Sequence, residues 1–95
     1  MPETLSVSHN PAAGLFEIRT EQGTALLRYA HAGPDLDVVH TEVPEALEGK
    51  GYGSALAKAA LAYAKDGGVK IIASCPFMTD YLHRHPEYAS LVATR

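Results

Sequence analysis

Three glycines separated by single residues lie near the middle of the chain, in Val43-Pro44-Glu45-Ala46-Leu47-Glu48-Gly49-Lys50-Gly51-Tyr52-Gly53-Ser54. Glycine lets the backbone turn sharply and leaves no side chain in the way of a ligand. Where such a segment begins a helix, its N–H groups point outward at the positive end of the helix dipole and form an anion site. The spacing Gly-x-Gly-x-Gly matches neither the Walker loop nor the dinucleotide-binding fingerprint. The residues alone therefore predict either an anion site or a flexible start of a helix.

The sequence contains a single cysteine, Cys75, directly before Pro76. Free cysteines are often small buried hydrophobic residues, which is the plainer interpretation. Proline is favoured at the first position of a helix, so Cys75 would cap that helix, where the dipole favours a thiolate. One thiol excludes an internal disulfide and a multi-thiolate metal site, and it suits a reducing cytoplasm.

His40 precedes the glycine segment and is the candidate general base, because imidazole titrates near neutral pH. A hydrogen-bonded structural histidine is an equal alternative. His83 and His85 are two residues apart and would diverge on a helix, so we expect no metal site. Tyr81 and Tyr88 could act as general acids toward a leaving group, or they could simply pack in the core.

The first half of the chain alternates apolar and polar residues, which predicts strands at 5–8, 15–19, 24–29 and 36–43. Short turns at Glu21-Gln22-Gly23 and Gly33-Pro34-Asp35 separate the later strands. Consecutive strands joined by short turns pair with one another. The pattern therefore predicts an antiparallel meander.

From Gly49 onward the apolar period changes to that of a helix, predicted over 51–66 and closed by Gly67-Gly68. The wheel leaves Leu61 among polar residues, and it collects on one broad face Tyr52, Leu56, Ala59, Ala60, Tyr63 and Ala64. A short buried strand over 69–74 and a second helix from Pro76 follow. The fold class is α+β: an antiparallel meander, a helix, one more strand and a short helix.

The 95 residues, 46% hydrophobic and 20% charged, predict one ordinary soluble domain spanning 1–95. The longest apolar run, Ala59–Ala64, is too short to cross a bilayer, and the first residues do not resemble a signal peptide. We therefore expect a cytoplasmic protein with no membrane partner, as a monomer or weak homodimer. The net charge of −3 argues against nucleic acid. The segment 49–84 is locally basic, which suggests a small anionic ligand, although scattered solvated lysines are the alternative.

The glycine segment and the alanine-rich helix after it resemble the acetyl-coenzyme A motif of the GNAT N-acetyltransferase superfamily, whose signature is Gln/Arg-x-x-Gly-x-Gly/Ala. Glu48-Gly49-Lys50-Gly51-Tyr52-Gly53 matches it except at Glu48, which leaves the backbone part of the motif intact. Three further segments resemble a very small GNAT-like branch with a cysteine near the acetyl group: His40-Thr41-Glu42-Val43-Pro44, Ser74-Cys75-Pro76-Phe77 and His85-Pro86-Glu87-Tyr88. The resemblance covers essentially the whole chain.

The resemblance implies a GNAT-like fold that binds acetyl-CoA or CoA as cosubstrate, without a metal. The pyrophosphate would be held by the amides of Gly49, Lys50, Gly51, Tyr52, Gly53 and Ser54. The pantetheine arm would lie along the backbone of Thr41, Glu42 and Val43, in the gap where this strand diverges from 71–74. Cys75 and His40 are the candidate catalytic residues.

The implied activity is transfer of acetyl from acetyl-CoA to a small amine or an exposed protein amine. Direct attack in a ternary complex is the superfamily's usual route, and a Cys75 thioester is the variant that the branch suggests. The alternatives are a CoA-binding or interaction module with little or no catalysis, and a scaffold that binds no CoA.

Overall fold

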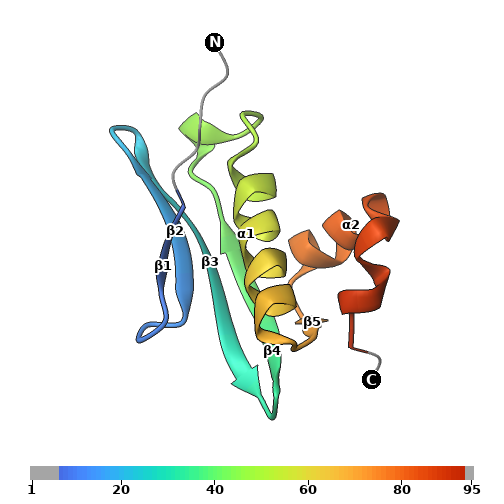
Figure 1. Ribbon diagram of the computed structural model, residues 1–95. Coiled ribbons are helices and arrows are strands. Elements are labelled where there is room, and N and C mark those ends of the chain that lie inside the picture. Colours follow the sequence, from blue (N-terminus) through green and yellow to red (C-terminus); the bar gives the residue numbers. More distant parts are fainter. Residues whose placement is uncertain (1–6, 94–95) are drawn as a thin grey trace.

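One five-stranded sheet forms the frame of the protein in a computed structural model, which describes residues 7–93 (Figure 1). Its strands follow one another in chain order and are β1 (Ser8–Asn10), β2 (Leu15–Thr20), β3 (Gly23–Ala32), β4 (Asp35–Glu42) and β5 (Ile71–Ala73). Strands β1 to β4 pair antiparallel, and β5 pairs parallel with β4. The predicted meander and the later strand are confirmed. Leu5 and Ser6 of the predicted first strand lie outside the described residues.

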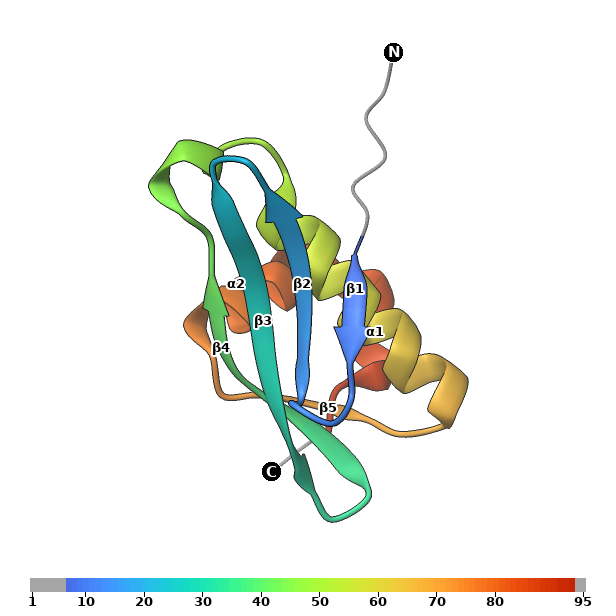
Figure 2. The same ribbon diagram turned by 90° about the vertical axis from the view of Figure 1, so that its left-hand side faces the viewer.

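Both α-helices, α1 (Tyr52–Gly67) and α2 (Pro76–Arg84), cover the same face of the sheet (Figures 1 and 2). Two short 3-10 helices that the periodicity did not indicate are η1 (Glu45–Leu47) and η2 (Pro86–Leu91). Within residues 7–93, no helix is long and apolar enough to cross a membrane. The core therefore lies in a single layer between the sheet and the helices.

Helix α1 ends as predicted, at a glycine in the left-handed region. Gly68 has φ 69°, its N–H donates to the Lys65 carbonyl at 3.2 Å, and the Val69 N–H donates to the Ala64 carbonyl at 3.0 Å. This pair of hydrogen bonds satisfies carbonyls that the last turn would otherwise leave free.

The buried face of α1 differs from the predicted one. Leu61, expected among polar residues, is fully buried, whereas Tyr63, expected in the core, is 39% exposed. The side chains that face the sheet are Leu56, Ala57, Ala60, Leu61 and Ala64. Three alanines let the helix approach the sheet closely, and the two leucines fill the space on either side, a choice that a helical wheel cannot make.

Strand β4 contains a bulge at Val39, which the alternation in the sequence did not show. Arg28 pairs with His40, but the next residue of β3, Tyr29, pairs with Val38, so Val39 is an extra residue. A bulge bends the strand and re-aims the side chains beyond it. Thr41, which pairs with the buried Leu27, therefore lies on the helix-covered face.

Candidate functional site

Strands β4 and β5 separate soon after they pair. Their ladder ends at Val38 and Ala73, and the Val38 carbonyl accepts hydrogen bonds from the N–H groups of both Ser74 (3.1 Å) and Cys75 (2.9 Å). The chain then turns into α2, while β4 continues to Glu42 without a strand beside it on that side in the described part of the chain. The predicted divergence of the two strands is therefore present.

A cleft of about 550 Å³ lies at this divergence. It is lined by Thr41, Glu42, Val43, Leu47, Glu48, Gly49, Gly51, Tyr52, Gly53, Ser54 and Phe77. All but Lys50 of the nine residues expected to bind the cofactor are thus brought together. Lys50 is exposed. Leu47 and Phe77 are lining residues that the motif did not reveal.

Two glycines of the segment are required by backbone conformation. Gly49 and Gly51 have φ of 79° and 85°, in the left-handed region that other residues rarely adopt, and a Cβ at either position would meet nothing within 4 Å. Gly51 caps α1 without a side-chain hydrogen bond. The N–H groups of the first turn, Tyr52, Gly53 and Ser54, have no partner within the helix, as in any helix. They belong to residues that line the cleft, so they are available to a ligand there.

Gly53 also has a packing role that the motif did not indicate. It is buried, and a Cβ there would lie 2.7 Å from Cζ of the Phe77 ring. The missing side chain therefore lets α2 pack its phenylalanine against the first turn of α1. This contact also makes Phe77 one wall of the cleft.

Cys75 caps α2 as predicted, with Pro76 in the first turn. The thiol is only 4% exposed and is not among the lining residues of the cleft. Its Sγ donates a hydrogen bond to Oγ1 of Thr41 at 3.4 Å, and Thr41 does line the cleft. The thiol thus lies behind the Thr41 side chain.

The structure does not bring His40 to the cleft. The bulge at Val39 leaves His40 opposite Arg28, on the face of the sheet that no helix of residues 7–93 covers (Figure 2). Its Nε2 lies 3.3 Å from Oε1 of Glu42, and the two side chains are 55% and 61% exposed. The role of His40 as a general base stays a prediction. Its side chain lies on the open face of the sheet and not in the cleft.

The two candidate acids of the C-terminal part are Tyr81 and Tyr88, and neither lines the cleft. Tyr81 is buried and stacks on His85 with ring centroids 4.2 Å apart. Burial raises the pKa of Tyr81, and the neighbouring Tyr88 and Glu87 raise it further. In residues 7–93, no three side chains of the metal-ligating types gather in one place.

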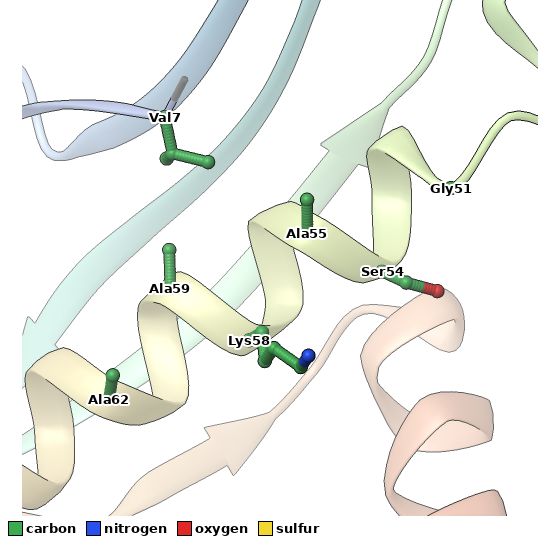
Figure 3. Close-up of a pocket in the computed structure, with 7 residues that line it drawn as sticks. All are labelled: Val7, Gly51, Ser54, Ala55, Lys58, Ala59 and Ala62. Carbon is green, nitrogen blue, oxygen red and sulfur yellow. The ribbon is translucent and has the colours of Figure 1, made fainter. Parts of the chain in front are cut away.

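A second groove, of about 540 Å³, runs along α1 from the same glycine segment (Figure 3). It is lined by Val7, Gly51, Ser54, Ala55, Lys58, Ala59 and Ala62. Gly51 and Ser54 line both the groove and the cleft, so the two hollows meet at the start of α1. Figure 3 shows Ser54 and Lys58 on one flank of the helix, with the Lys58 amine directed toward Ser54.

The chain that forms this cleft and this glycine-rich start of α1 matches a known protein family. The model of the GCN5-related N-acetyl-transferase family covers residues 15–91. The chain therefore belongs to the GCN5-related N-acetyltransferase (GNAT) family, as the resemblance implied.

Similar proteins include Protein NATD1 from several vertebrates. The human protein is 32% identical over 85 residues, which are 86% of this chain and 75% of that protein. The zebrafish protein is 33% identical over 89 residues, 88% of this chain and 81% of that protein. The fold is similar to the solution structure of a GCN5-like protein from Staphylococcus aureus, with a TM-score of 0.77 and 26% identity over 96% of this chain and 90% of that one.

Proposed function

We propose that the protein transfers an acetyl group from acetyl-CoA to a primary amine within the cleft between β4 and the start of α1. The observation that carries the proposal is the shape of this one hollow. Free N–H groups of a helix start lie at one part of it, and the strand whose partner has diverged lies at another. Family membership supports acyl transfer as the reaction class.

The diphosphate of CoA would be held mainly by backbone N–H groups of residues 49–54. Gly49 and Gly51 adopt the left-handed backbone conformation that turns the N–H groups of this loop toward one point. Glu42 and Glu48 also line the cleft, and their carboxylates repel phosphate. Phosphate binding must therefore come from the amides, the helix dipole and nearby lysines rather than from residue 48.

Lys58 is the cation best placed to reach the nucleotide end of CoA. It lines the groove that joins the cleft at Gly51 and Ser54, and in the described part of the chain it makes no ion pair. The floor of that groove is built of alanines, which leave room for a flat adenine ring. The groove therefore suits the adenosine 3′-phosphate portion.

Direct attack of the amine on the acetyl group fits this site better than a Cys75 thioester. Cys75 is 4% exposed, and Thr41 stands between its thiol and the cleft. A nucleophilic thiol must reach the acyl carbon, and the Cys75 thiol is not among the groups that line the cleft. Cys75 would therefore act from behind the cleft wall.

The first experiment measures binding and turnover separately. Calorimetry with CoA and acetyl-CoA should give micromolar dissociation constants that weaken as salt is added, because part of the attraction is to phosphate. Release of free CoA from acetyl-CoA in the presence of an amine panel then tests transfer. Binding without turnover would identify a CoA-binding module instead, and no binding at millimolar CoA would refute the proposal.

A further inference from the structure

The contact between Thr41 and Cys75 places a hydroxyl, not a thiol, at the wall of the cleft. Thr41 lines the cleft and is half-buried, whereas Cys75 is almost fully buried and does not line it. The two atoms that meet are Sγ of Cys75 and Oγ1 of Thr41, 3.4 Å apart. Thr41 lies in β4 and Cys75 caps α2 two residues after the end of β5, 34 positions later in the chain. The group able to touch a bound acyl chain is therefore the Thr41 side chain.

The direction of this hydrogen bond leaves the Thr41 hydroxyl with a free hydrogen. A hydroxyl has one donor and two acceptor positions. The Cys75 S–H donates to Oγ1 and occupies one acceptor position. Among the described residues, no group accepts a hydrogen bond from the Thr41 hydroxyl. Its O–H can therefore point into the cleft toward an acceptor on a ligand.

The bulge at Val39 is the reason that Thr41 has this position. Before the bulge, Leu36 and Val38 face the helices. If the side chains of β4 alternated strictly, His40 would also face the helices. Because Val39 is an extra residue, His40 lies on the open face of the sheet and Thr41 lies on the face that the helices cover. The strand thus presents a small side chain with one donor where the cleft begins.

We propose that the Thr41 hydroxyl donates a hydrogen bond to the carbonyl oxygen of the acyl thioester, and that Cys75 is the positioning residue that orients this hydroxyl. The inference rests on the function proposed above. As the amine nitrogen forms its bond to the acyl carbon, the C=O electron pair moves to oxygen, where the Thr41 donor stabilises it. The pair then re-forms the carbonyl while the C–S bond breaks. The sulfur leaves as the thiolate of CoA with the two electrons of the C–S bond, and water takes the proton that the amine nitrogen loses.

The inference predicts a difference between two ligands that differ only in the acyl group. Thr41→Val keeps the shape of the side chain but removes the donor. It should weaken binding of acetyl-CoA about fivefold, the worth of one modest hydrogen bond, and change binding of CoA less than about twofold. Thr41→Ser should restore the affinity for acetyl-CoA. Calorimetry without an amine measures both ligands, and intact-mass analysis verifies that acetyl-CoA is not consumed.

Thr24→Val is the matched control, because Thr24 is a half-buried threonine of β3 that lines neither hollow. It should change neither affinity. The inference would be overturned if Thr41→Val lowered the affinities for CoA and acetyl-CoA equally, or if it left the affinity for acetyl-CoA unchanged. Neither result would contradict the proposed function. If the unaltered protein binds neither ligand, the proposed function fails and the inference fails with it.

Substitutions at Cys75 separate the positioning role from a covalent one. Cys75→Ala removes the donor to Thr41 and should weaken the binding of acetyl-CoA about two- to threefold. Cys75→Ser keeps a donor and should bind acetyl-CoA like the parent. Comparable melting temperatures of the two variants show that a loss in Cys75→Ala is not a loss of folding. A hydroxylamine-labile acetyl group on Cys75 after exposure to acetyl-CoA would place the acyl carbon at the thiol and overturn the assignment.

Discussion

The two ends of the helix-covered face are built in opposite ways. At the β1 edge, the rings of His9, Phe16, Tyr29 and Tyr63 close the sheet against α1, with His9 stacked on Phe16 at 4.2 Å. At the β4 edge, a three-residue β5 and a glycine segment leave a cleft of about 550 Å³. Large rings fill the space at the first edge, whereas glycines without side chains leave it open at the second. The molecule thus separates a closely packed edge from the edge that contains the cleft.

The largest effect on stability is expected from a substitution that disrupts the aromatic edge. Phe16 is 3% exposed and contacts the rings of His9, Tyr29 and Tyr63. Phe16→Ala should lower the free energy of unfolding by about 3–5 kcal/mol, measured by urea denaturation. The folded fraction should bind CoA as the parent does, because this edge lies away from the cleft. A specific loss of CoA affinity with unchanged stability would contradict the division between the edges.

Filling the glycine at the other edge should affect both stability and binding. The Cβ of Gly53→Ala would lie 2.7 Å from the Phe77 ring, so the ring or α2 must move. We expect a loss of about 1–3 kcal/mol of stability from overpacking, together with weaker CoA binding as the wall of the cleft shifts. Gly67→Ala, at the other end of α1 with nothing within 4 Å of the new Cβ, is the control: it should leave CoA binding unchanged and raise stability slightly, by up to about 1 kcal/mol, because alanine is the better helix former.

A smaller effect is expected in the groove that continues the cleft. Lys58→Ala should weaken the binding of CoA about three- to fivefold at low salt, the effect of one partly exposed charge contact. It should leave the affinity for dephospho-CoA unchanged, because that ligand lacks the 3′-phosphate. Lys65→Ala removes the same charge from a part of α1 outside both hollows and should affect neither ligand. An equal loss for both ligands would mean that Lys58 acts on the diphosphate or at long range.

The smallest effect is a pH dependence of the aromatic edge. Burial lowers the pKa of His9 from its ordinary value of 6.5, and Nε2 of its ring lies 2.6 Å from the Tyr29 hydroxyl. The rings around it are those of Phe16, Tyr29 and Tyr63, and none carries a charge at neutral pH.

Because the folded-state pKa is below the unfolded value, the unfolded chain binds more protons as the pH falls through 6.5. Stability is full above that pH, declines below it and levels off below the folded-state pKa. Denaturation between pH 7.5 and 5 should show this extra decline in the parent relative to His9→Gln. Parallel curves for the two proteins would assign the pH dependence to other groups.

The meander, the helices and the turn residues between them follow from local chemistry, and the sequence predicted them. Alternation over 15–19 and 24–29 and the left-handed Gly68 are properties of neighbouring residues, so they can be read without knowledge of the fold. The glycine segment was located in the same way, and eight of the nine residues predicted to bind the cofactor line one cleft.

The errors arose where residues far apart decide the outcome. Leu61 is buried, and Tyr63 is partly exposed, because the alanines of α1 and the rings of β1 and β2 decide how that helix seats on the sheet. The close packing of Phe77 against Gly53, 24 positions earlier in the sequence, was not predicted at all. No local period carries such information.

The sequence by itself determined the strands of the meander, the two α-helices, the family resemblance and the glycine segment before an alanine-rich helix. Only the tertiary structure decided which side chains meet at the cleft. The extra residue at Val39 turned His40 to the open face and Thr41 to the cleft, and the early end of β5 placed Cys75 behind Thr41. The register of paired strands is settled by the packing of the whole sheet, and a shift of one residue exchanges the side chains of its two faces.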